Sequence, residues 1–427
     1  MQPGVLLLML CVGVLLLAPD LEANHEKAII SLNSRLLRST TLPANPSVHI
    51  ALRLSEHHSF HDELSYLHRL KIDLRRKLSR SRLANEPSTG LTALYVLALR
   101  ASCQGMSEKQ AALSYLKKKL AAEQNHTTHH QVLLSNHYQY SLGVLTLCVN
   151  NIRLDHSVLS GLMSHDHHHH NHHHHHSIDT LAMEVLALQC VVGSKVPSRN
   201  SWMYSQDRRA KAQKAVNKLM ERMRRWQASS GEIGNIYSTS LALQAFIATG
   251  DQERWLKGRN HLLKEAKRGA FQNPMALSQL LPVLYQKTYL DIQQMDCRGE
   301  TGDLKQLQLK PLATARDPEP SSQPEFVYLS VKDKNFVTTY STRVPLSNQM
   351  SLLQVLHEAK SNDTNFKFET VPTLWGPFLV SVNGVTGQDS TRTYWRLISG
   401  TDTPLIQGIQ DYQPQPGEHI LLQLSDY

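Results

Sequence analysis

The sequence predicts a multidomain protein of α then α+β type, with an N-terminal α/α toroid, or barrel, followed by a small β-rich domain. Three observations support this prediction. Long apolar helical segments recur along the first 300 of the 427 residues, and basic amphipathic segments separate them. Beyond the proline-rich stretch 309–325 the pattern changes to short strands. An open solenoid of helix pairs is the alternative to a closed toroid.

The apolar segments each begin near a Ser, Thr, Asn or Asp, residues that cap a helix by accepting a hydrogen bond from a free backbone N–H. They occupy residues 88–103, 134–149, 177–192 and 235–250, and a fifth, bent at Pro282, occupies 273–285. Because they are apolar around most of their circumference, we expect them to form a buried inner ring. If they run parallel, their amino ends meet at one rim, where free N–H groups favour polar or anionic ligand groups.

The basic amphipathic segments, of which 62–80 and 207–227 are the clearest, are predicted to form the outer layer. They contribute to a formal net charge of +9. We interpret this charge as a solvated outer face and expect no nucleic-acid partner.

The chain divides into four predicted parts: a signal peptide over 1–23, the α/α barrel over 24–305, a linker over 306–325 and the β-rich domain over 326–427. The apolar run 5–17 is too short to cross a membrane and has the length of a signal-peptide core. We therefore expect a secreted, extracellular monomer without membrane insertion. In the last part, residues 350–360 predict a helix and Asn383-Gly384 a tight turn.

Secretion determines how the cysteines are interpreted. Those outside the predicted signal peptide are Cys103, Cys148, Cys190 and Cys297. In an oxidising compartment they predict two disulfides, with three possible pairings. The sequons at Asn125 and Asn362 are candidate glycosylation sites.

Catalytic motifs are absent from the sequence, which has no Gly-rich phosphate loop, no GxSxG elbow and no HExxH motif. A glycosidase built on a toroid would need two opposed carboxylates. Asp179 and Glu184 lie on one predicted helix, and no second acid is placed across from either. We therefore expect a binding protein and not an enzyme.

Ten histidines lie between His165 and His176, and an apolar segment follows directly. One hypothesis is a loop that binds metal without specificity, which would make the chain a secreted histidine-rich zinc- or copper-binding protein on an α/α toroid scaffold. The other is that His176, at the entry of an inner helix, has a defined partner at the rim.

Four segments resemble one known family: HHSIDTLAM, GNIYSTSLALQ, GAFQNPMALSQLLPVLYQKTYLDI and YWRLISGTDTPLIQGIQDY. They are similar, in the same order, to the cobalamin-carrier family of transcobalamin, intrinsic factor and haptocorrin. A histidine directly before Ser-Ile-Asp-Thr is most similar to transcobalamin. The resemblance implies an α barrel and a β-rich domain with cobalamin (vitamin B12) between them, carried unchanged and taken up with the protein by a cell-surface receptor.

The resemblance also implies roles for residues. His176 would be the axial ligand of the cobalt of cobalamin, although His172 to His175 could substitute for it. The other cobalamin-binding candidates are Ser135, Tyr138, Asp179, Asn235 and Gln279 in the barrel, and Thr373, Phe378, Trp395 and Leu405 in the small domain. The plain alternatives are helix caps for Asp179 and Asn235 and core packing for Trp395.

The resemblance also implies a disulfide pairing, and two positions differ from the family pattern. The implied disulfides are Cys103–Cys297 and Cys148–Cys190. Leu91 stands where the transcobalamin pattern has a contacting glutamine, and Thr92 is the candidate to compensate. Trp375 stands where a serine is usual, so we expect part of the small-domain contact to be reshaped.

Overall fold

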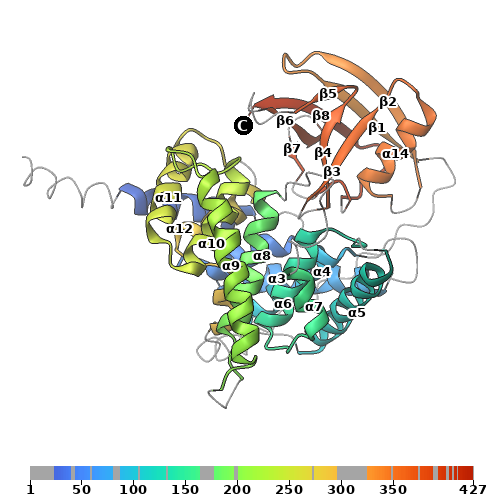
Figure 1. Ribbon diagram of the computed structural model, residues 1–427. Coiled ribbons are helices and arrows are strands. Elements are labelled where there is room, and N and C mark those ends of the chain that lie inside the picture. The colour runs from blue at the N-terminus through green and yellow to red at the C-terminus, as the bar shows by residue number, and fades with distance from the viewer. Residues whose placement is uncertain are drawn as a thin grey trace, which may run out of the picture.

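The computed structural model describes residues 24–39, 44–57, 60–79, 87–103, 106–130, 133–163, 177–196, 201–271, 274–295, 325–347, 350–373, 376–387, 393–400, 403–405, 408–410 and 412–426. The predicted signal peptide, almost all of the predicted linker, the histidine tract with His176, and Cys297 lie outside these residues. Helices occupy the first part, beginning with one over residues 24–38, and a small β-rich domain follows (Figure 1).

The inner ring consists of α2 (Pro46–Leu54), α4 (Thr89–Ala101), α6 (His137–Val149), α8 (Ile178–Gly193), α10 (Ile236–Thr249) and α12 (Pro274–Leu284). Each of these helices packs against the next, and α12 packs back against α2. The ring is therefore closed, and the structure is the predicted toroid and not an open solenoid. Its interior is one continuous hydrophobic core.

The outer layer alternates with the ring along the chain: α3 (Phe60–Ser79), α5 (Met106–His130), α7 (His156–Met163), α9 (Gln206–Trp226) and α11 (Gln252–Lys267). In α9 the buried residues are Ala212, Val216, Met220 and Met223, which form a single stripe at helical spacing. Its lysines face outward, as the amphipathic pattern predicts.

The predicted capping residues begin the inner helices. Ser88 Oγ accepts from Leu91 N at 3.1 Å, and Asn136 Oδ1 accepts from Gln139 N at 2.9 Å. Ser177 Oγ accepts in the same way from the backbone of α8. Each cap satisfies an N–H group that the helix itself leaves without an acceptor.

The first inner helix, α2, was not among the predicted apolar segments. It carries His49 and Arg53, so its sequence does not have the all-apolar pattern, yet both side chains are buried. Arg53 pairs with Glu63 of α3, Nη1 to Oε2 at 3.1 Å, and donates from Nε to Ala101 O. Partners supplied by other helices thus make a polar helix compatible with the core.

The buried His49 predicts a loss of stability in acid. Burial lowers its pKa from 6.5 to about 4, with Glu63 raising the pKa and Arg53 lowering it further. The unfolded chain takes up this proton near pH 6.5 and the folded chain near pH 4. The contribution of neutral His49 to the free energy of unfolding is therefore fully present above pH 6.5 and is lost as the pH falls to 4. The loss is about 3 kcal/mol.

This loss is measured as the difference between parent and His49→Gln in the pH dependence of the free energy of unfolding. The parent should lose about 3 kcal/mol more than the variant between pH 7 and pH 4. Parallel curves for the two proteins would contradict the assignment.

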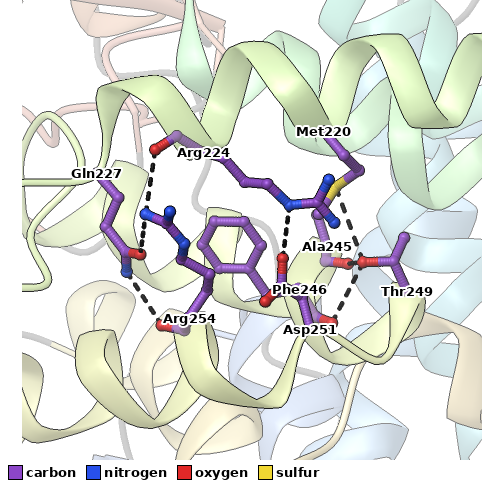
Figure 2. Close-up of polar contacts among 8 residues, drawn as sticks. All are labelled: Met220, Arg224, Gln227, Ala245, Phe246, Thr249, Asp251 and Arg254. Atoms are coloured by element: carbon purple, nitrogen blue, oxygen red, sulfur yellow. Dashed lines mark hydrogen bonds and ion pairs between the residues drawn. The ribbon is translucent and has the colours of Figure 1, made fainter.

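Polar contacts also join the outer helices α9 and α11 (Figure 2). Arg224 Nε donates to Asp251 Oδ2 at 2.7 Å, and Gln227 Nε2 donates to Arg254 O at 3.0 Å. Thr249, the last residue of α10, donates to Ala245 O within the same view. This network lies at the carboxyl end of α10, away from the amino ends of the inner helices.

The small domain contains β1 (Glu325–Lys332), β2 (Thr338–Leu346), α14 (Leu352–Asn362), β3 (Phe368–Thr373), β4 (Gly376–Val382), β5 (Val385–Thr386), β6 (Thr393–Ser399), β7 (Thr403–Pro404) and β8 (His419–Asp426). One sheet has the order β2-β1-β8-β6-β7, with β1 and β8 parallel, and the other has the order β3-β4-β5. The predicted helix over 350–360 is α14. Asn383 and Gly384, with φ of 49° and 81°, form the predicted turn between β4 and β5.

The two domains have separate hydrophobic cores among the described residues. In the view of Figure 1, β3, β4 and β7 form the side of the small domain nearest to the helices. Among the described helices, none combines the length and apolar character needed to cross a membrane.

Candidate functional site

The amino ends of neighbouring inner helices lie together, which defines a rim formed by the first turns of α4, α6, α8 and α10. Gly234, just before α10, has φ of +69°, and a Cβ there would lie 3.0 Å from Ile178 Cδ1 at the start of α8. Gly90 N in α4 donates to Gln139 Oε1 in α6 at 3.1 Å. The inner helices therefore run parallel, and their positive ends gather at this rim.

Tyr138, in the first turn of α6, places a buried hydroxyl at the rim. This hydroxyl has no hydrogen-bond partner among the described residues. Burial raises the pKa of Tyr138 well above its usual 10, and the nearby Tyr289 and Asp179 raise it further. A buried hydroxyl without a partner is costly, so a polar group of a ligand would satisfy it.

Asp179 lies on α8, the next helix of the ring, close enough to act on the Tyr138 hydroxyl. It is not the helix cap, because Ser177 Oγ accepts from Thr180 N at 3.2 Å. One Asp179 carboxylate oxygen is shielded from solvent. Ser177, and not Asp179, is therefore the N-cap of α8, and the charge of Asp179 raises the pKa of the buried Tyr138.

Asn235 does act as a helix cap, since its Oδ1 accepts from the backbone of Tyr237 and Ser238 at 2.9 Å each. Its amide nitrogen is the part that a ligand could use. Gln279, on α12, is buried in the ring. Ser135 precedes α6, and its backbone N–H donates to the buried carboxylate of Glu123.

The small-domain candidates lie in different surroundings. Trp395 is 4% exposed, belongs to the core and donates from Nε1 to Val385 O, so the plain reading of core packing holds for it. Leu405 packs partly buried on the same core, and Thr373 ends β3. Phe378 is 45% exposed. Tyr138 and Asp179 therefore lie in the first turns of neighbouring inner helices, whereas Trp395 lies in the core of the small domain.

Phe378 has an apolar neighbour that the sequence patterns did not indicate. Val371 on β3 lies directly opposite Phe378 on β4, and it is 43% exposed. The pair gives the three-stranded sheet an exposed apolar patch. Only the strand register identifies it, because seven positions separate the two residues in the sequence.

Two further positions differ from what sequence patterns suggested. Thr92 is fully buried and donates from Oγ1 to Ser88 O at 2.9 Å, so its hydroxyl does not replace the glutamine absent at Leu91. Tyr289, beside Tyr138, lies in the 3-10 helix η2 (Tyr289–Gln294) and was not predicted as a site residue. Burial raises the pKa of Tyr289 to about 12, while its hydrogen bond to Gln244 lowers the pKa.

Among the described cysteines, the disulfide bonds agree with the predicted pairing. Cys148 of α6 and Cys190 of α8 form a disulfide. Cys103 is disulfide-bonded as well. The predicted partner Cys297, like His176 and Trp375, lies outside the described residues.

Comparisons with known proteins agree with this architecture. The family model described as eukaryotic cobalamin-binding protein matches residues 2–317. Transcobalamin-2 of Mus musculus is 36% identical over 93% of both chains, and that of Homo sapiens is 34% identical over 90% of this chain and 88% of its own. A crystal structure of haptocorrin in complex with Cbi aligns with a TM-score of 0.56 and 26% identity, covering 94% of this chain and 97% of that chain. The chain therefore belongs to the eukaryotic cobalamin-binding protein family.

Proposed function

We propose that this chain is a secreted monomeric carrier that binds cobalamin and transports it without changing it. The observation that carries the proposal is the buried Tyr138 hydroxyl at the rim. This hydroxyl has no hydrogen-bond partner among the described residues, and the charge of Asp179 acts on it. Family membership supports the ligand, since the relatives are named transcobalamin-2 and the related haptocorrin was solved with Cbi.

The rim suits the chemistry of cobalamin, which has a flat apolar macrocycle, a fringe of amides and a central cobalt. Tyr138, Asp179 and Gln279 offer hydroxyl, carboxylate and amide groups to the amide fringe. Val371 and Phe378 offer an apolar patch to one face of the macrocycle. His176 supplies the axial nitrogen, and a neutral imidazole suits this metal.

Delivery follows from the same proposal. The segment 1–23 directs secretion, and a cell-surface receptor takes up the loaded carrier. Asn125 and Asn362 are both exposed, which is compatible with glycosylation.

Replacing Tyr138 with phenylalanine separates ligand binding from stability. Tyr138→Phe should weaken cobalamin binding about tenfold, because one buried hydrogen bond to the ligand is lost. It should also stabilise the empty protein by about 1 kcal/mol, because an unsatisfied hydroxyl is removed. Equilibrium binding of cobalamin and urea unfolding of the empty protein measure the two effects.

Tyr204→Phe is the matched control for this prediction. The Tyr204 hydroxyl accepts a hydrogen bond from Leu154 N at 3.1 Å, away from the rim. Its loss should lower stability and leave cobalamin affinity unchanged. If Tyr138→Phe also left cobalamin affinity unchanged, the Tyr138 hydroxyl would not contact the ligand, and the proposal would lose its main support.

The histidine ligand is tested by visible spectra of the complex with the aquo form of cobalamin. The parent should show replacement of the upper water by imidazole, and this signal should weaken in acid because protonation competes with the metal. The test uses a chain in which His172 to His175 are replaced by glutamine, so that none of them can substitute. In this parent chain, His176→Ala should lose the signal and His165→Ala should keep it. Identical spectra for parent and His176→Ala would reject His176 as the axial ligand. A histidine-rich zinc or copper carrier, the rival function, would leave the desalted protein colourless after incubation with cobalamin.

A further inference from the structure

The last two turns of α5 carry two histidines whose rings lie close together. His126 and His130 are four residues apart on the helix, and their ring centroids are 4.4 Å apart with an interplanar angle of 33°. Side chains at this spacing lie on one helix face, one above the other. The pair is not among the residues proposed above to contact cobalamin, and in the sequence it precedes the tract that ends at His176.

The turn that carries this pair is held on both sides. Just before it, the buried carboxylate of Glu123 accepts from Leu134 N and Ser135 N at 2.7 and 3.1 Å, which ties the following loop back to α5. Gln124 Nε2 donates to the Tyr140 hydroxyl, which in turn donates to Val158 O of α7. Neighbouring helices therefore fix the backbone on which the two imidazoles stand, which reduces the entropy lost on chelation.

We propose that His126 and His130 chelate one divalent transition-metal ion through a nitrogen of each imidazole. Imidazole suits copper, zinc and nickel, and Cu2+ should bind most tightly of the divalent ions. The pair lies at the carboxyl end of α5, where the helix dipole favours a cation. This site does not depend on cobalamin binding.

The number of protein ligands limits the affinity of the site. No group of three or more metal-ligating side chains occurs among the described residues, so the pair supplies two ligands and water completes the coordination. The bound ion should therefore exchange readily, unlike one held in a closed structural site.

The test must remove competition from the histidine tract. Cu2+ is titrated into the full chain carrying His165→Gln and the same change at every tract histidine through His175, with His176 retained. Electron paramagnetic resonance counts the bound Cu2+ and detects its nitrogen ligands. Hydrogen exchange of the amides in the last turn of α5 locates the ion, since a chelate across one turn slows fraying.

We expect one Cu2+ per chain and slower exchange at the end of α5. His126→Gln and His130→Gln should each weaken binding about tenfold or more, because each removes one of two ligands. His129→Gln, a matched change in the same turn, should leave the affinity unchanged. Unchanged affinity in His126→Gln and His130→Gln, or an equal loss in His129→Gln, would overturn the proposal.

Cobalamin retention is measured on the same preparations as a check of folding. A chain that retains cobalamin but shows no effect of the His126 and His130 changes overturns the metal site alone. A chain that binds Cu2+ at the pair but does not retain cobalamin supports the metal site and contradicts the proposed carrier function.

Discussion

Replacing Glu63 with alanine is expected to lower the free energy of unfolding of the helical domain by about 3–5 kcal/mol. The side chains of Glu63 and Arg53 are each 3% exposed, and their ion pair joins α3 to α2. Removing the carboxylate leaves the Arg53 guanidinium buried without this counter-charge. Urea unfolding followed by far-UV circular dichroism measures the loss.

The matched control replaces both partners at once. Arg53→Met combined with Glu63→Leu removes both charges and fills a similar volume, so it should recover most of the stability that Glu63→Ala loses. This comparison separates the cost of a lone buried charge from the loss of packing. A loss below about 1 kcal/mol in Glu63→Ala would show that Arg53 tolerates burial without this partner.

Removing the Cys148–Cys190 disulfide is expected to cost about 4 kcal/mol in the chain-entropy model. The bond joins α6 to α8 across a separation of 42 residues, so it restricts the unfolded chain substantially. The double variant Cys148→Ala with Cys190→Ala removes the bond without leaving a free thiol. Its free energy of unfolding, compared with that of the parent, gives the contribution.

Folding of that double variant is checked by its retention of cobalamin, because α6 and α8 carry Tyr138 and Asp179 at their other ends. A retained ligand together with a lowered unfolding free energy is the expected combination. Equal stability of variant and parent would show that the link between α6 and α8 comes from packing alone.

Local signals explain the parts of the fold that the sequence predicted. Ser88, Asn136 and Ser177 act within three residues of themselves, so their capping roles can be read from the chain. The turn at Asn383-Gly384 is equally local, because both residues readily adopt positive φ. The repetition of such segments predicted the toroid with an open solenoid as the alternative, and the packing of α12 against α2 decides between them.

The parts that could not be predicted depend on partners far along the chain. Helix α2 was not predicted because it contains Arg53 and His49, whose burial depends on partners on other elements. The isolated hydroxyl of Tyr138 and the facing pair of Val371 and Phe378 exist only once neighbouring elements are in register. For the same reason, the sequence alone could not show that Thr92 uses its hydroxyl within its own helix.

Closure of the ring has a consequence for synthesis. Helix α2 receives its last neighbour only when α12 arrives, and Asn45 meets Met275 across 230 residues of chain. At ordinary rates of translation, about 10–50 s pass between the emergence of these two helices. During that interval one apolar flank of the nascent domain stays uncovered, so a chain that ends before α12 should be captured by chaperones rather than released.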